Sequence, residues 1–186
     1  MNTMIRQQRI RRGYTLVEML VVVTILGIAG ALLVPSFGQT DTLRLQGAVR
    51  TLVADITVTQ SDAIAFQRSR GIQFTIASDE SSYTMANVTG NELDVENDVI
   101  GRQRIDGEIF GFARFSDAEM NDRQLVFDEM GSPINLSDGS SVGTQWIEIA
   151  GNRQTYRVAV EAYTGRCTVA LVRDLDAAEP IGEPGG

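Results

Sequence analysis

The feature that most limits the fold is an almost uninterrupted apolar run over residues 14–34. Its only polar side chains belong to Thr15, Glu18 and Thr24. As an α-helix the run would span about 31 Å, close to the roughly 30 Å hydrocarbon core of a bilayer. The run therefore predicts a helix of membrane length, and the folded domain must be built from the residues that follow it.

The residues on either side of this run differ in charge. Four arginines and no acidic residue lie within residues 1–13, and no comparable positive cluster follows the run. Because positively charged flanks stay in the cytoplasm, we expect the N-terminus there and the C-terminal domain on the far side of the membrane.

The composition excludes many kinds of active site. All 16 basic residues are Arg, so the chain has no Lys and no His for a nucleophile–base pair, a P-loop lysine, a Schiff base or an imidazole metal ligand. Cys167 is the only cysteine, so no intrachain disulfide can form, and its alternating surroundings favour packing over reactivity. No pair of carboxylates stands out. We therefore expect no enzymatic activity, no cofactor and no metal.

Three interpretations of the apolar run remain open on its residues alone. A secretory signal peptide could be cut at the small residues 29–31, which would leave a chain starting near Leu32. A plain membrane anchor is the second. The third begins from Glu18, because a carboxylate inside an apolar helix costs on the order of 3 kcal/mol at the bilayer centre and calls for a partner.

The string GYTLVE, from Gly13 to Glu18, resembles the processing site of type IV prepilins and pseudopilins. The resemblance implies that prepilin peptidase cuts between Gly13 and Tyr14 and that the new amine of Tyr14 is N-methylated. It implies that Glu18 pairs with the N-terminal amine of another subunit during filament assembly, and that Pro35 kinks the helix. Each of those two charges would be costly alone in a low-dielectric filament core, and they compensate each other when paired.

Downstream patterning suits an α+β, pilin-like fold, in which a long N-terminal helix packs on an antiparallel β-sheet. We expect a helix that restarts at Thr40 or Asp41 and runs to about Arg68. Its apolar stripe comprises Leu45, Val49, Leu52, Ile56, Thr59, Ala63 and Phe66. Strands are predicted at residues 72–76, 83–88, 124–128, 145–150, 155–162 and 166–173, the last three as an antiparallel meander. Residues 89–123 are predicted to be a loop-rich insertion with two short strands.

This patterning predicts five segments. They are a leader peptide at residues 1–13, the transmembrane and assembly half of the helix at 14–37, its amphipathic half at 38–70, a β-rich globular domain at 71–173 and a disordered tail at 174–186.

The C-terminal half is similar to the GspH/FimT group of minor pseudopilins and minor pilins. The similar stretches are LVFDEMG, WIEIA and the turn over residues 164–166. The resemblance implies a structural minor pseudopilin of a type II secretion system. The alternatives are a minor pilin of a type IV pilus, serving motility, adhesion or DNA uptake, and a conventionally secreted binding module. The expected partners are prepilin peptidase, other pilin or pseudopilin subunits and the inner membrane before assembly into a periplasmic filament.

Three further features are candidate sites. Acidic residues alternate over residues 92–98, which could ligate calcium but fits a solvated edge strand better. Arg166 and Arg173 could contact DNA, yet from residue 14 onward acidic residues outnumber basic ones two to one, which argues against nucleic acid as a partner. Trp146 is expected on a sheet face or in the core rather than in a ligand site.

Overall fold

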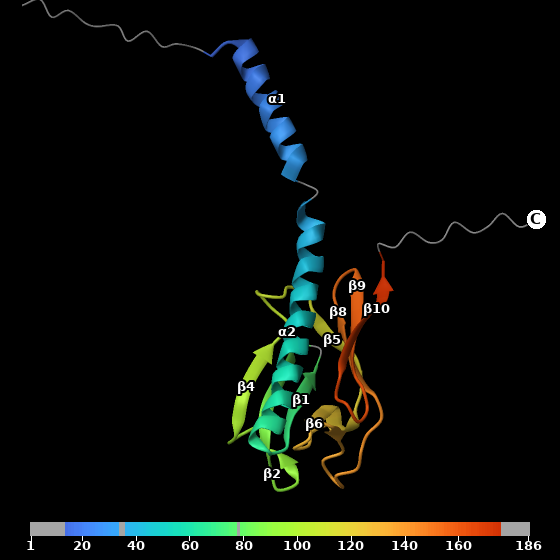
Figure 1. The fold of residues 1–186 in the computed structure, drawn as a ribbon. Coiled ribbons are helices and arrows are strands. Elements are labelled where there is room, and N and C mark those ends of the chain that lie inside the picture. The colour runs from blue at the N-terminus through green and yellow to red at the C-terminus, as the bar shows by residue number, and fades with distance from the viewer. Residues whose placement is uncertain (1–13, 34–35, 78, 176–186) are drawn as a thin grey trace, which may run out of the picture. The chain divides into compact units, whose positions relative to one another are not determined.

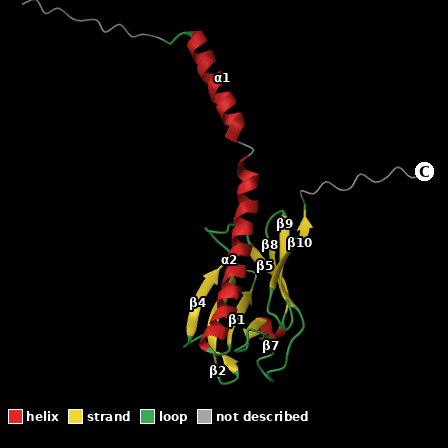
Figure 2. Ribbon diagram, viewed as in Figure 1, coloured by secondary structure: helices red, strands yellow, loops and turns green. Residues whose placement is uncertain are grey.

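The computed structural model describes residues 14–33, 36–77 and 79–175. The chain divides into two compact units, Met1–Gly38 and Gln39–Gly186, and each is described by itself. Figure 1 colours their elements in chain order, and Figure 2 distinguishes helices from strands. Within the described residues, both α-helices come before the first strand in the chain.

The first unit contains helix α1 (Leu16–Leu33). Thr15 begins it, because its Oγ1 accepts a hydrogen bond from the backbone N–H of Glu18 at 3.2 Å, as an N-cap residue does. Thr24 Oγ1 donates to the carbonyl of Leu20, which satisfies the one other hydroxyl of the helix. Over the residues described, none of the helices combines the length and the hydropathy required to span a membrane. The predicted kink residue Pro35 lies outside the described residues.

Helix α2 (Ser36–Phe66) begins four or five residues before the predicted restart at Thr40 or Asp41. Its apolar stripe is buried as expected from Leu45 to Ala63, with Leu52 and Ala63 fully inaccessible. The prediction that Phe66 belongs to the buried stripe was wrong, because this residue is 61 % exposed. Its ring lies instead under the guanidinium of Arg70, 4.5 Å from Cζ to the ring centroid, so a cation–π contact takes the place of core packing.

The strands form two antiparallel sheets. The first sheet contains β1 (Arg70–Ile76), β2 (Ser81–Thr89), β3 (Glu92–Leu93), β4 (Val99–Arg104), β6 (Gln124–Phe127) and β7 (Pro133–Ile134), in the order β3-β2-β1-β6-β7 with β4 also paired to β2. Strands β1 and β2 are the predicted hairpin, with Ile72 opposite Met85. Ile72 also lies opposite Leu125 of β6, so β1 is a central strand.

The second sheet contains β5 (Arg114–Glu119), β8 (Gln145–Ala150), β9 (Gln154–Val160) and β10 (Cys167–Asp174), in the order β10-β9-β8-β5. Strands β8, β9 and β10 are the predicted meander. Two expectations were wrong. Residues 89–123 hold three strands and a 3₁₀ turn, η1 (Asn121–Arg123), rather than two strands. Asp174 pairs with Gln154 inside β10, so the tail does not begin there.

One hydrophobic core joins α2 to both sheets. Phe74, Tyr83 and Phe115 contact one another at its centre, with Phe74 and Phe115 edge to face at 5.5 Å between centroids. The two sheets are also hydrogen-bonded, because the backbone N–H of Phe115 in β5 donates to Ser81 Oγ in β2.

The end of α2 is fastened at one further point. Gln60 Nε2 donates to the carbonyl oxygens of Gly131 at 2.8 Å and Thr164 at 2.9 Å. Gly131 follows β6 of the first sheet, and Thr164 lies in the β9–β10 turn of the second. Glycine is required at Gly165 because its φ is +64° and a Cβ would lie 2.6 Å from the backbone carbonyl oxygen of Gly131 as well as against the Gln60 amide.

Candidate functional site

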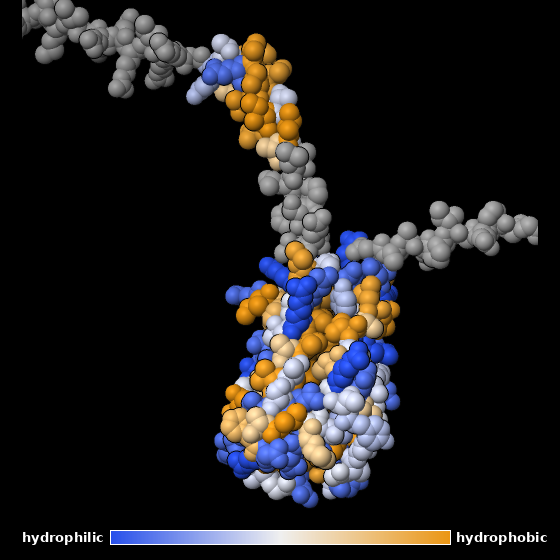
Figure 3. Space-filling view, viewed as in Figure 1, coloured by the Kyte–Doolittle hydropathy of each residue, from blue (hydrophilic) through white to orange (hydrophobic). Residues whose placement is uncertain are grey.

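The surface of α1 is the first candidate site. Its large apolar side chains between Leu16 and Ile28 are exposed on every side of the helix, with exposed fractions between 46 % and 81 %. Figure 3 shows this helix as an almost continuous hydrophobic surface. Apolar exposure on this scale is typical of a segment that lipid or other helices cover.

Two of the predicted site residues lie at the start of this helix. Tyr14 is 74 % exposed, and Glu18 is exposed in the first turn, where the helix dipole favours a negative charge. The third, Gly13, lies outside the described residues. The structure therefore places the carboxylate of Glu18 at the accessible end of an apolar helix, one turn from Tyr14.

An apolar groove of about 530 Å³ lies on the second unit, between α2 and the second sheet. Its lining combines one face of α2 with β9 and β10, from Gln46, Val49, Arg50, Val53, Ala54, Tyr156 and Val169. Outside this lining, Leu171 and Val172 on edge strand β10 are also nearly half exposed. Orange side chains beside α2 in Figure 3 mark hydrophobic surface on this unit. The sequence did not reveal this groove, because the same residues were predicted only as helix and strand.

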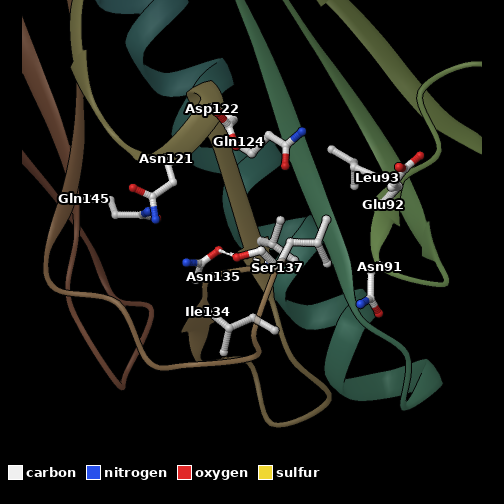
Figure 4. Close-up of a pocket in the computed structure, with 12 residues that line it drawn as sticks. Asn91, Glu92, Leu93, Asn121, Asp122, Gln124, Ile134, Asn135, Ser137 and Gln145 are labelled. Atoms are coloured by element: carbon white, nitrogen blue, oxygen red, sulfur yellow. Dashed lines mark hydrogen bonds between the residues drawn. The ribbon is translucent and has the colours of Figure 1, made fainter.

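A second, polar pocket of about 350 Å³ opens where the two sheets meet near η1. Five segments form its wall, namely the β2–β3 turn with β3, η1, β6, the end of β7 with the loop after it, and the first residue of β8. Figure 4 shows Gln145 and Asn121 on one side of this pocket and Asn91, Glu92 and Leu93 on the other. The sequence did not predict this pocket, because its residues come from five separate segments that form no continuous motif.

Two acidic residues of segment 92–98, Asp94 and Asp98, have local partners. Asp94 Oδ1 accepts hydrogen bonds from the backbone and side chain of Asn97, and the backbone contact holds the pKa of Asp94 below its usual range. Asp98 Oδ1 accepts from Asn87 Nδ2 at 2.8 Å. Only Glu92 and Leu93 are in a strand, so the predicted edge strand is mostly a turn. The described part of the chain holds no cluster of three or more metal-ligating side chains.

The remaining candidates lie on the second sheet. Arg166 and Arg173 are exposed near opposite ends of the β10 segment. Trp146 lies on the sheet face, where its indole N–H donates to Glu119 and the Arg157 guanidinium stacks 4.0 Å from its ring centroid. Cys167 is a free thiol packed against the core, and burial raises its pKa to about 11.

Comparison with known proteins gives a match at the N-terminus. The family model described as the prokaryotic N-terminal methylation motif matches residues 8–34, which include the GYTLVE string and all of α1. No curated protein sequence matches the chain.

Comparison with solved structures bears on the fold. The chain is similar to the type IV minor pilin FimU of Pseudomonas aeruginosa strain PAO1 in its P2₁ crystal form, with a TM-score of 0.53 at 13 % identity, covering 73 % of this chain and 98 % of FimU. The P6₅ form of FimU aligns with a TM-score of 0.45 at 14 % identity, over 70 % of this chain and 98 % of FimU. The P2₁ form shows a shared fold. In its N-terminal methylation motif and in its fold, the chain is type IV pilin-like.

Proposed function

We propose that this chain is a structural, non-enzymatic minor subunit of an envelope filament of the pilin class, and that it joins the filament through α1. One observation carries the proposal. The methylation motif at residues 8–34 coincides with a helix whose apolar side chains are exposed all round. A processing motif placed before such a helix keeps the helix in the mature protein, where it serves association rather than export.

The proposed assembly step is electrostatic. Cleavage between Gly13 and Tyr14 by prepilin peptidase would create an ammonium group at Tyr14, which the same enzyme N-methylates. Among packed apolar helices, that charge and the carboxylate of Glu18 would each be costly alone and would stabilise each other as an ion pair between neighbouring subunits. The exposed position of Glu18 in the first turn leaves its carboxylate free to reach such a partner.

The proposed location follows from the same residues. The arginine-rich leader would stay in the cytoplasm, α1 would hold the precursor in the inner membrane as a single span, and the second unit would lie in the periplasm before assembly. The apolar groove between α2 and the second sheet gives the periplasmic part a further surface for neighbouring subunits.

Two machines are candidates. The GspH/FimT resemblance of the C-terminal half supports a pseudopilus of a type II secretion system, which drives protein secretion. The fold shared with FimU supports a type IV pilus, because FimU is a minor pilin of that filament. Deletion of the gene in its host distinguishes them. Loss of secreted proteins with surface pili intact supports the pseudopilus, and loss of pili with secretion intact supports the pilus.

Charge reversal at Glu18 tests the mechanism. Full-length Glu18→Arg should be processed normally but absent from purified filaments, because two positive charges would then meet at the subunit contact. Gly13→Asp is the matched control and should block processing itself. Normal incorporation of Glu18→Arg would contradict the charge-pair mechanism.

N-terminal sequencing of the mature protein tests the processing step. A methylated tyrosine at residue 14 supports the proposal. A start near Leu32 would contradict it, because that cut removes α1 and leaves a conventionally secreted binding module.

A further inference from the structure

The polar pocket beside η1 has a lining unlike the other surfaces of the second unit. Five of its twelve lining residues carry side-chain amides: Asn91, Asn121, Gln124, Asn135 and Gln145. Each amide offers donors and an acceptor, so together they match groups that both donate and accept. Hydroxyl groups do both, whereas a phosphate or a carboxylate only accepts.

The charged and apolar residues of the lining further limit the chemical class of ligand that would bind. Glu92 and Asp122 are the ionisable residues of this lining, and both are acidic, so the described wall supplies no cation for an anionic ligand. Leu93, Val126 and Ile134 add an apolar patch. A ligand with hydroxyl groups around its edge and C–H groups on its face fits this combination, and a volume of about 350 Å³ lies at the small end of ligand pockets.

Gln145 is the one buried amide in this lining. Its side chain is 6 % exposed at the start of β8, and its Oε1 has no hydrogen-bond partner in the described part of the chain. A buried polar atom without a partner costs about 1–3 kcal/mol, and native structures contain few of them. Because this oxygen has almost no accessible surface, a donor from a bound molecule would satisfy it after the amide turns toward the pocket.

The wall of the pocket is held in place by an amide relay. Gln124 Nε2 donates to Gln73 Oε1 at 2.8 Å, and Gln73 Nε2 donates to the backbone carbonyls of Asp122 and Arg123. Asp122 and Arg123 have φ of +52° and +56°, a strained conformation for residues other than glycine. The relay therefore fixes η1 at the pocket in advance of ligand binding.

We propose that this pocket binds one unit of a neutral, hydroxyl-rich ligand, namely a sugar ring, with the Gln145 amide turned so that its Oε1 accepts from a hydroxyl group. The site is independent of α1 and of filament assembly. It gives the second unit a binding role that neither the methylation motif nor the shared fold assigns.

Saturation-transfer NMR on the full chain tests the proposal, with the protein in dodecylphosphocholine because that detergent has no sugar headgroup. The probe is N-acetylglucosamine, and its β-1,4-linked tetramer is the second arm. We expect saturable binding with a dissociation constant on the order of 1 mM. Equal affinity of the two probes supports a single free sugar, and tighter binding of the tetramer supports a glycan chain. No binding of either probe up to about 10 mM would overturn the proposal.

Two variants and an anionic probe sharpen the test. Gln145→Leu removes the unpartnered oxygen at nearly constant volume and should weaken binding at least about tenfold without loss of thermal stability. Asn121→Ala changes an exposed side chain that folding does not need, and should weaken binding about fivefold. Gln103→Leu, on β4 and outside the pocket, is the matched control and should bind as the natural chain does. Glucuronate should bind more weakly than the neutral probe. Unchanged binding in Gln145→Leu and Asn121→Ala, or equal binding of glucuronate, would overturn the assignment.

Discussion

A single phenol joins the middle of α2 to the first sheet. Tyr83 is fully buried, and its hydroxyl donates to Asp55 Oδ2 at 2.5 Å. Burial and the neighbouring carboxylate raise the pKa of Tyr83 far above its usual value, so it stays a donor at every physiological pH. Tyr83→Phe leaves the carboxylate without this donor and should lower the free energy of unfolding by about 1–3 kcal/mol, measured by urea denaturation.

Tyr163→Phe is the matched control, because Tyr163 is 74 % exposed. Removing the hydroxyl group of this exposed tyrosine should leave the free energy of unfolding unchanged. An equal loss in the two variants would show that the Tyr83 hydroxyl contributes nothing specific.

The thiol of Cys167 should react slowly. Because burial raises its pKa to about 11, only about one thiol in a thousand is ionised at pH 8, and the thiolate is the reactive form. Alkylation by iodoacetamide, followed by mass spectrometry, should be roughly a hundredfold slower in the folded chain than in urea. The rate should keep rising with pH up to about 11. A plateau near pH 8.5 in the folded protein would contradict this.

Among the elements, α2 holds the largest share of the core. Leu52 is fully buried at the centre of its stripe. Leu52→Ala should lower the free energy of unfolding by about 2–5 kcal/mol, because it removes buried methyl groups and leaves a cavity. Val58→Ala, on the outer face of the same helix at 50 % exposure, should change it little, as urea denaturation of both variants would show. Similar losses would mean that the helix packs on both faces.

The elements differ in how far the sequence predicts them. The stripe from Leu45 to Ala63 repeats every three or four residues and is buried as predicted. A helix that buries one face needs apolar residues at this spacing, so the spacing predicts the buried face. Phe66 continues the period but lies beyond the sheet, so its contact with Arg70 could not be foreseen. Strand β5 was missed because only Phe115 is deeply buried, and its stability comes from pairing with β8, far along the chain.

At the scale of the whole molecule, the buried core and the apolar surface of α1 lie in different units. The core side chains begin at Leu45, and the exposed apolar side chains of α1 lie before residue 31. A chain that begins at Gln39 should therefore keep its fold and remain monomeric in water, while the full chain should associate without detergent. Size-exclusion chromatography and circular dichroism of the two proteins would test this. Association of the shorter chain would assign the contact to the second unit.

The same division explains what could be predicted about function. The motif around Gly13 and Glu18 is continuous in the sequence, so the residues alone are enough to recognise it. The polar pocket could not be recognised in this way, because Asn91, Asn121 and Gln145 come together only after the two sheets have formed. Local chemistry is visible in a sequence, and sites assembled from distant segments are not.

The two hydrogen bonds of Gln60 bear on how this domain would carry force. A pull along the helix would reach the carbonyl oxygens of Gly131 and Thr164 through one amide group, and these lie in turns next to strands of different sheets. In a filament of the proposed kind, tension on α2 would therefore reach both sheets at this point as well as through the shared core.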